Sequence, residues 1–358
     1  MNPLQQLASH GQSIWLDFIR RGHTRTGGIA KMVTEDGLRG MTSNPAIFQQ
    51  AIAASTDYED FLAQMVGDAS RDTKTIFEAL AIEDIREAAD ALKPVYDQTK
   101  TLDGYISLEV SPSLADDADG TLEEARRLWQ AVDRPNVMIK VPGTPQGLVA
   151  IEELLAEGIN VNITLLFAVS AYAEVAEAHL KALERRAAKN QPIDEIASVA
   201  SFFVSRIDVE IDARLEKLAA AAPEADRAKI LALRGKAAIA NAKLAYADVY
   251  QPLIASPRWE ALAAKGARPQ RLLWASTGTK NKAYPDTIYV DELIGPDTVN
   301  TAPPATIDAF RDHGKVANTL TADVDQARAD MAALKTAGVD VDDVTTLLLD
   351  RGKELFRD

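Results

Sequence analysis

The chain has 358 residues, of which 47% are hydrophobic and 26% are charged, an ordinary globular balance that supports a sizeable core rather than disorder. Its formal net charge of -14 at pH 7 argues against nucleic acid or an anionic membrane as a general partner, so an anionic substrate would need a local basic pocket. Because the sequence has no cysteine, it excludes disulfides, thiolate chemistry and cysteine-based metal sites. The start lacks the pattern of a signal peptide and no apolar run is long enough to span a bilayer, so we expect a cytoplasmic protein.

The first part of the chain alternates short apolar runs with stretches of helical periodicity. Runs bounded by glycine, proline or charged residues predict strands at 13–19, 37–44, 105–112 and 136–144. Apolar residues at helical spacing predict a helical segment to about residue 35, two or more helices between about 56 and 98, and an acidic helix over 121–132.

The same alternation continues to the C-terminus. Strands are predicted at 159–167, 198–206, 271–276 and 287–291. Helices are predicted at 146–156, at 170–189, and over 209–250 as two helices broken at Pro223. The tail from about Pro303 is mostly helical, with a turn near 336–338, and the apolar face of its last helix, over 344–356, is expected to pack on the rest of the fold through Leu347, Leu348 and Leu355.

Strands that alternate with helices imply right-handed crossovers and a parallel sheet. Eight strands predict an α/β fold of the closed (β/α)₈ TIM-barrel type with additional helices. No repeat or linker divides the sequence, so we expect one domain over residues 1–358. An open doubly wound sheet is the alternative, but the sequence lacks a GxGxxG segment after its first strand.

One of the apolar runs contains a lysine. Lys140 lies in Asn136-Val137-Met138-Ile139-Lys140-Val141-Pro142-Gly143-Thr144, which indicates a buried strand closed by a Pro-Gly turn. Because burial disfavours the charged form of an amine, a lysine in such a strand can be neutral and attack a carbonyl. Two other placements stay open, since the side chain can reach water at the strand's end or pair with a buried carboxylate.

Polar side chains stand at or near the end of almost every predicted strand, where the active sites of barrels are built. They are Asp17, Asn44, Glu109, Lys140, Asn162, Thr164, Ser201, Arg206 and Ser276. Each alone has an ordinary explanation, such as a helix cap for Asp17, a turn for Asn44 or a backbone contact for Thr164. Together, an amine, two carboxylates and neutral donors in apolar surroundings favour Schiff-base chemistry.

Other chemistries fit the sequence less well. The four histidines are scattered over predicted helices and loops, and no paired-carboxylate spacing stands out, so no metal site is predicted. A Ser-His-Asp triad lacks both a nucleophile elbow and a histidine at a strand end.

Two segments carry candidate phosphate ligands. Ser276-Thr277-Gly278-Thr279-Lys280 follows the seventh strand, where barrels often hold phosphate with N–H groups, hydroxyls and a cation, although an ordinary turn is the alternative. Arg206 follows the sixth apolar run, and its guanidinium fork fits phosphate oxygens.

Five segments follow one another in an order typical of a single family. They are Thr42-Ser43-Asn44-Pro45, Ile106-Ser107-Leu108-Glu109-Val110, Ile139-Lys140-Val141-Pro142-Gly143-Thr144, Gly158-Ile159-Asn160-Val161-Asn162-Ile163-Thr164-Leu165-Leu166-Phe167 and Ala200-Ser201-Phe202-Phe203-Val204-Ser205-Arg206-Ile207-Asp208. In combination they resemble the transaldolase family of the pentose phosphate pathway, and the helical insertions and the Gly-Thr-Lys-Asn segment resemble its longer bacterial branch. The resemblance implies a barrel with its Schiff-base lysine on the fourth strand.

Several residues of this chain match positions of the family's motifs, and the resemblance implies that they have the same roles. The resemblance implies that Lys140 forms the Schiff base, that Asp17 is the acid/base group, and that Glu109 acts through a water held with Thr164. It implies substrate binding by Asn44 and Asn162, which would orient hydroxyls, by Ser201 and Phe203 in the pocket, and by Arg206 and Ser276 at the phosphate.

One departure from the family pattern concerns the phosphate site. Shorter members have an arginine shortly after the serine that matches Ser276, whereas this chain continues Thr277-Gly278-Thr279-Lys280. We infer that Lys280 takes its place, which keeps the cation but not the planar fork.

The implied activity transfers a dihydroxyacetone unit from sedoheptulose 7-phosphate or fructose 6-phosphate to glyceraldehyde 3-phosphate or erythrose 4-phosphate. No cofactor or metal is expected, because the lysine itself is the electron sink. Sugar phosphates are the expected partners, with no nucleic acid and no membrane, and the chain is expected to be a monomer or a homodimer. Two alternatives stay open: a class I aldolase of the fructose 6-phosphate type, which would release dihydroxyacetone, and a non-catalytic sugar-phosphate-binding barrel.

Overall fold

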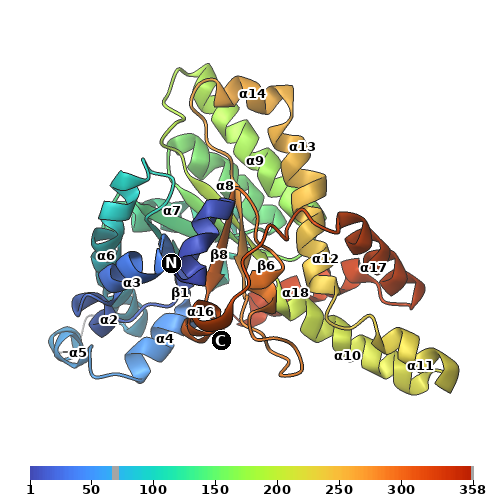
Figure 1. Cartoon of the computed structure of the whole chain (residues 1–358). Helices are drawn as coiled ribbons and strands as arrows, with labels where there is room; N and C mark the ends of the chain where they lie inside the picture. The colour runs from blue at the N-terminus through green and yellow to red at the C-terminus, as the bar shows by residue number, and fades with distance from the viewer. Residues whose placement is uncertain (67–71, 356–358) are drawn as a thin grey trace.

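The computed structural model describes residues 1–66 and 72–355, and its centre is a closed barrel of parallel strands in the order β1 to β8 (Figure 1). The strands are β1 Gln12–Asp17, β2 Gly40–Thr42, β3 Tyr105–Glu109, β4 Val137–Pro142, β5 Val161–Leu166, β6 Ser198–Phe203, β7 Arg271–Ala275 and β8 Thr298–Ala302. β1 pairs with both β2 and β8, which closes the sheet. The prediction of a (β/α)₈ barrel is confirmed.

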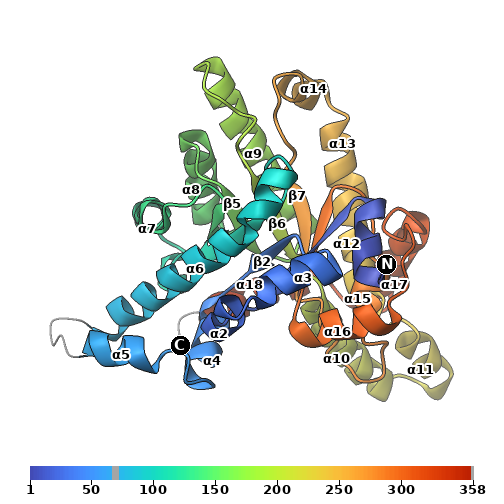
Figure 2. The ribbon, with the colours of Figure 1, turned by 60° about the vertical axis from the view of Figure 1, so that its left-hand side comes forward.

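Helices surround the barrel on its outer side (Figures 1 and 2). They are α1 Pro3–Gln6, η1 Leu7–His10, α2 Arg21–Arg25, α3 Gly28–Asp36, α4 Pro45–Ala53, α5 Glu59–Val66, α6 Thr73–Gln98, η2 Pro112–Leu114, α7 Ala118–Val132, α8 Pro145–Glu157, α9 Val169–Ala188, α10 Ser205–Ala221, α11 Glu224–Leu231, α12 Ala237–Leu244, η3 Ala245–Tyr250, α13 Gln251–Ile254, α14 Pro257–Ala263, α15 Ile288–Asp291, α16 Pro304–His313, α17 Val324–Thr336 and α18 Val341–Leu355. None of the helices within the described residues combines the length and the apolar character needed to cross a membrane.

Two predicted segments differ from the structure. The predicted eighth strand at 287–291 is wrong: this segment forms the one-turn helix α15, and the strand that closes the barrel is β8 at Thr298–Ala302. Both runs are short and largely buried, and pairing with β1 and β7 is what identifies the second run as the strand. The stretch 209–250 breaks at Pro223 as predicted but contains more than two helices, because a new helix begins at Ala237 and continues into a π-helical turn.

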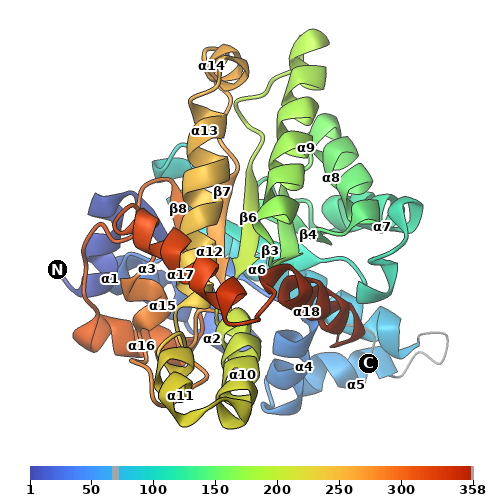
Figure 3. The same ribbon diagram turned by 90° about the vertical axis from the view of Figure 1, so that its right-hand side faces the viewer.

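The last helix, α18, lies beside α10 and reaches β5 (Figure 3). Leu348 is buried in the main core, so the expected packing of this helix is confirmed for that residue. Leu347 is half-buried, and it is Leu349 that packs beside Leu348 against the core. Ion pairs of Arg351 with Glu210 and of Lys353 with Asp116 fix the helix at both sides. The side chain of Leu355, all of Phe356, and residues 67–71 of the predicted helical stretch lie outside what the structure describes.

At the N-terminal end of the strands, the barrel contains the indole of Trp15 and the buried ion pair of Asp103 with Arg271. The indole of Trp15 is fully buried, and it packs so closely on Gly40 that a Cβ there would lie 2.5 Å from the ring. Its Nε1 donates to Asp103, which also accepts hydrogen bonds from Ser13 and Arg271 at 2.7 and 2.9 Å. Because the two charges are nearly inaccessible, each depends on the other for compensation.

Replacing Asp103 by Ala therefore leaves a buried guanidinium without its carboxylate. Loss of one partner of a buried ion pair lowers the free energy of unfolding by about 3–5 kcal/mol, whereas an exposed pair contributes about 1 kcal/mol or less. We expect urea denaturation to show a loss in the larger range for Asp103→Ala. Asp97→Ala, which removes the exposed partner of Lys93, is the control, and equal losses in the two variants would contradict the assignment.

Candidate active site

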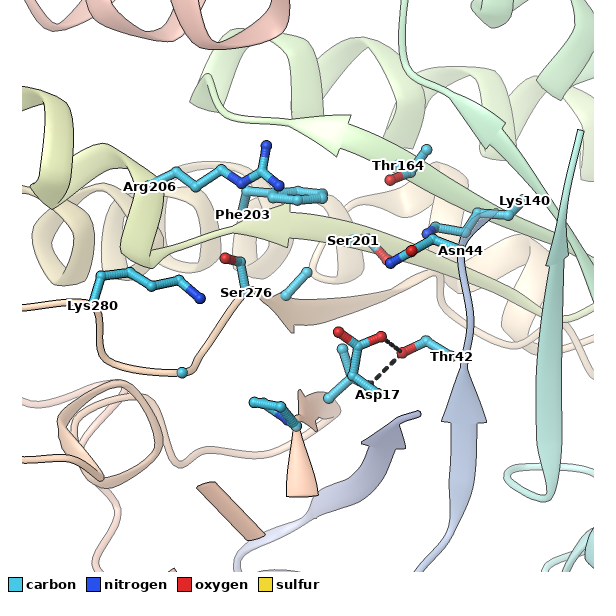
Figure 4. A pocket seen from close by; sticks show the side chains of 14 residues that line it. Asp17, Thr42, Asn44, Lys140, Thr164, Ser201, Phe203, Arg206, Ser276 and Lys280 are labelled. Carbon is cyan, nitrogen blue, oxygen red and sulfur yellow. Dashed lines mark hydrogen bonds between the residues drawn. The ribbon is translucent and has the colours of Figure 1, made fainter. Parts of the chain in front are cut away.

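A cavity of about 200 Å³ opens where the C-terminal ends of the strands meet (Figure 4). It is smaller than the range of about 300–1,000 Å³ that is usual for drug-sized ligands. Its lining comes from strand ends and the loops that follow them: Asp17, Thr42, Asn44, Lys140, Thr164, Ser201, Phe203, Arg206, Ala275, Ser276, Gly278, Lys280, Thr301 and Pro303. Of the site residues predicted from sequence, Glu109 and Asn162 do not line the cavity but hold residues that do.

Lys140 lines this cavity and is nearly inaccessible to solvent. The residue is 6% exposed, and its Nζ donates to the carboxylate of Glu109 at 3.0 Å and to the carbonyl oxygen of Ser43 at 3.2 Å. The register of β3 and β4 places Glu109 directly beside Lys140, so the contact follows from strand pairing. Of the placements left open by the sequence, the structure has the buried ion pair.

Glu109 is the partner in this pair, and its side chain is 3% exposed. Burial raises the pKa of the Glu109 carboxyl above its ordinary value, although the nearby Lys140 ammonium acts in the opposite direction. The carboxyl is therefore a better proton donor near neutral pH than an exposed glutamate would be. The hydrogen bond from the Lys140 Nζ holds this proton donor beside the amine.

Asp17 ends β1 and faces the cavity. Its Oδ1 accepts a hydrogen bond from the Thr42 hydroxyl at 2.7 Å, and the Thr42 and Thr301 hydroxyl oxygens lie 2.6 Å apart. Burial raises the pKa of Asp17, and the hydrogen bond from Thr42 and the charges of Lys140 and Lys280 partly offset that rise. This carboxylate is consequently a stronger base than an exposed aspartate.

Thr164 presents a hydroxyl at the end of β5. The residue is buried, and its Oγ1 has no hydrogen-bond partner among the described residues, so it is available to a substrate atom or a water. The strand is irregular here: Leu165 has a φ of +61°, and the pairing of β5 with β6 shifts register between Ile163 and Leu166. Bulges of this kind re-aim side chains next to active sites.

Amide side chains support the wall of the cavity. Asn162 donates from Nδ2 to the Ser107 hydroxyl at 2.8 Å and accepts from the Ser201 hydroxyl at 2.7 Å, which fixes Ser201 at the cavity. Asn44 caps α4, because its Oδ1 accepts the N–H of Ile47 at 2.9 Å. The amide nitrogen of Asn44 remains for a ligand, so its capping role and a binding role are compatible.

Arg206 and Lys280 lie on the side of the cavity opposite Lys140. In the view of Figure 4, Asp17 lies between these two cations on one side and Lys140 on the other. Arg206 lies in the first turn of α10 rather than on a strand, and its guanidinium stacks over the ring of Phe203 at 5.4 Å. Lys280 is exposed on the loop after β7. Ser276 opens that loop with a φ of +56°, and its hydroxyl oxygen lies 3.1 Å from that of Ser205.

Sequence reasoning missed some of the lining. The sequence patterns do not indicate Thr301 or Pro303, because they place the eighth strand at 287–291; with β8 at Thr298–Ala302, Thr301 lies near a strand end. Thr42 shares a face with Asn44 by the two-residue period of a strand, and its own contact with Asp17 follows from the pairing of β1 and β2.

Comparisons with known proteins agree with this geometry. Residues 14–358 match the model of a family described as Transaldolase/Fructose-6-phosphate aldolase. The chain belongs to this family. It is 49% identical over 358 residues to a protein named Transaldolase from Trichodesmium erythraeum, with 99% of this chain and 94% of that protein aligned. A Frankia alni protein with the same name is 49% identical over 364 residues, covering 100% and 94%, and one from Thiobacillus denitrificans is 47% identical over 356 residues, covering 99% and 97%.

The family assignment from sequence is confirmed by these matches. Relatives named transaldolase align with the chain along its whole length, which supports transaldolase function and places this family member among the enzymes that transfer aldehyde or ketone residues.

The contact between Thr42 and Asp17 yields a test that needs no substrate. Thr42→Val removes a hydrogen bond that favours the charged carboxylate, so the pKa of Asp17 should rise further. NMR titration of the side-chain carboxyl measures it. Thr277→Val, which removes a hydroxyl bonded to the Thr301 carbonyl instead, should leave it unchanged. An unaltered pKa in Thr42→Val would show that the hydrogen bond does not tune this carboxyl.

Proposed function

We propose that this member of the transaldolase family transfers a dihydroxyacetone unit between sugar phosphates through a Schiff base on Lys140. The observation that carries the proposal is the position of the Lys140 amine, buried beside Glu109 and facing a cavity that also contains Asp17 and two cations. An amine, an acid and a base around one small space are the groups that imine-based cleavage of a carbon–carbon bond requires.

The first stage forms the imine. The Nζ of Lys140 attacks the keto carbon C2 of a ketose phosphate, such as fructose 6-phosphate or sedoheptulose 7-phosphate, and gives a carbinolamine. Glu109, with its raised pKa, supplies the proton with which the C2 hydroxyl leaves as water. The Thr164 hydroxyl, which has no partner among the described residues, supports a relay through a water between this carboxyl and the substrate.

The second stage breaks the bond between C3 and C4. Asp17 removes the proton of the C4 hydroxyl, and C4 becomes the carbonyl carbon of an aldehyde. The electron pair of the broken C3–C4 bond moves into the iminium and gives an enamine. The aldose phosphate leaves. The enamine, held by Asn44 and Ser201, then adds to the aldehyde of erythrose 4-phosphate or glyceraldehyde 3-phosphate, and Asp17 returns its proton to the new hydroxyl. Hydrolysis of the imine frees Lys140.

The phosphate of the substrate is proposed to bind between Arg206 and Lys280, with Ser276 as a hydroxyl donor. Neither cation has a carboxylate partner within the described residues, so both charges are available to an anion. A substrate held at that side extends its carbonyl toward Lys140 and places C4 near Asp17, as the arrangement in Figure 4 supports.

The second candidate is a fructose 6-phosphate aldolase, because the matched family is described by both activities. An aldolase would protonate the enamine and release dihydroxyacetone, whereas a transaldolase retains it until an acceptor arrives. The non-catalytic binding alternative is not favoured, because the buried Lys140–Glu109 pair and Asp17 are in place.

We further propose that the protein is cytoplasmic, that residues 1–358 form one domain, and that it acts as a monomer or homodimer. The cysteine-free composition supports the cytoplasmic location.

Borohydride reduction in the presence of fructose 6-phosphate should trap a three-carbon adduct on the peptide that contains Lys140. Lys243 is the control within the same sample, because it is also buried, at 5% exposure, but lies outside this cavity and donates to a backbone carbonyl. Addition of erythrose 4-phosphate before reduction should diminish the adduct if the unit is transferred. An adduct on another lysine, or turnover near normal in Lys140→Met, would overturn the assignment.

Asp17→Asn should separate the two stages, because imine formation does not need this carboxylate and carbon–carbon cleavage does. We expect kcat to fall by about 10²- to 10⁴-fold, the usual effect of a general base. Mass spectrometry of the reduced protein should then find the six-carbon phosphorylated adduct on Lys140 rather than the three-carbon one. Asp97→Asn, at an exposed position, should behave as the unaltered protein, and a three-carbon adduct in Asp17→Asn would assign the base elsewhere.

A further inference from the structure

Lys280 lies on a loop, and its ammonium forms no hydrogen bond or ion pair with any residue that the structure describes. The chain from 276 to 287 carries it, between the end of β7 and the start of α15. A long exposed side chain on such a loop is well placed only if the loop itself is fixed. The contacts that fix it are therefore part of the binding geometry.

The outer part of this loop is fastened to α10 by a tyrosine. The hydroxyl of Tyr284 donates to Oδ2 of Asp212 at 2.6 Å, and Oδ1 of the same carboxylate accepts the N–H of Gly235 at 3.0 Å. Gly235 has a φ of +71°, and a Cβ there would lie 2.8 Å from Cζ of Tyr284. Glycine suits position 235 for two reasons: the positive φ disfavours other residues, and a side chain there would clash with the Tyr284 ring. We call Tyr284, Asp212 and Gly235 the Tyr284 lock.

A parallel contact lies one turn earlier on the same helix. The hydroxyl of Tyr289 donates to Asp208 at 2.7 Å, and the other oxygen of Asp208 accepts the N–H of Ala238 at 2.8 Å. Asp208 and Asp212 are four residues apart, so they share one face of α10. Arg206 lies in the first turn of this helix, so the helix that carries one proposed phosphate cation also anchors the loop that carries the other.

Lys280 also lies near acidic side chains of α10. Lys280 borders a second cavity, of about 240 Å³, whose lining includes Asp208, Asp212 and Glu216. The oxygens of Asp208 and Asp212 are already occupied by tyrosine hydroxyls and backbone N–H groups. These hydrogen bonds hold both carboxylates in place, and Lys280 forms no ion pair with either of them or with Glu216, which pairs with Arg234 at 2.7 Å.

We propose that the Tyr284 lock consists of positioning residues that set the place of Lys280 relative to Arg206 and so determine the affinity for the phosphate group of the substrate. The inference rests on the proposed function, in which these two cations bind that phosphate. The lock touches neither the substrate nor Lys140, Glu109 or Asp17. Its loss should therefore act on phosphate binding and not on the chemistry at the carbonyl.

The first experiment compares Tyr284→Phe with Tyr246→Phe in the full chain. Tyr246 is a matched control because its hydroxyl also donates one hydrogen bond, to the Pro296 carbonyl, on a segment that does not line the active-site cavity. With fructose 6-phosphate and erythrose 4-phosphate, Tyr284→Phe should raise KM by about three- to tenfold, the effect of one lost hydrogen bond, and leave kcat within about twofold. Activity with the unphosphorylated pair, fructose and glyceraldehyde, should not change. An equal loss with both substrate pairs would overturn the proposal.

A double-mutant cycle tests whether the lock acts through Lys280. In the Lys280→Ala background, Tyr284→Phe should raise KM no further, because the side chain that it positions is gone. Full additivity of the two effects would overturn the proposal. Gly235→Ala, which obstructs the ring instead of removing its hydroxyl, should reproduce the KM effect of Tyr284→Phe, and a normal KM in that variant would count against the lock.

Binding of inorganic phosphate, measured by calorimetry, separates this inference from the proposed function. If Lys280→Ala weakens phosphate binding and Tyr284→Phe does not, the lock is wrong and the phosphate site stands. If neither Lys280→Ala nor Arg206→Ala alters phosphate binding, the proposed phosphate site fails and the lock, which depends on it, fails too. Loss of phosphate affinity in both Lys280→Ala and Tyr284→Phe, without loss in Tyr246→Phe, supports both.

Discussion

The pairing of β3 with β4 sets Glu109 beside Lys140, and the rest of the site is arranged around that contact. An isolated ammonium or carboxylate in the barrel interior would be strongly unfavourable, but the two together compensate each other. The same parallel register continues around the barrel, where Asp17 pairs with Thr42 and Lys140 with Asn162. One set of backbone hydrogen bonds therefore fixes the catalytic candidates relative to one another, without a loop having to position any of them.

Much of the fold could be predicted from sequence because the buried strands of a parallel barrel leave a strong local signal. Short apolar runs closed by glycine or proline locate β1 to β7, and alternation with helices implies the closed sheet. The eighth strand could not be located in this way. Segments 287–291 and 298–302 have similar length and burial, and β8 is distinguished by the partners on either side of it rather than by its own residues.

The candidate site shows the same difference between features that depend on local sequence and features that depend on long-range contacts. Residues at strand ends, such as Asp17, Lys140 and Thr164, could be predicted because strand direction alone brings them to one mouth, while their catalytic roles stay predictions. Contacts between distant segments could not. Nothing in the local sequence indicates that Lys140 pairs with Glu109 instead of reaching solvent, because the two residues are 31 positions apart. The hydrogen bond of Tyr284 with Asp212 joins residues 72 positions apart and leaves no local signal either.

Arg206 and Lys280, which form no ion pair with any residue that the structure describes, have a further consequence in a chain whose formal net charge is -14. Seen from a distance, such a protein repels a sugar phosphate. At physiological ionic strength, however, charges are screened over about 8 Å, so an approaching anion senses only the groups that are close to it. On the proposal that Arg206 and Lys280 bind the phosphate, their attraction acts only once the anion is within about that distance of the cavity.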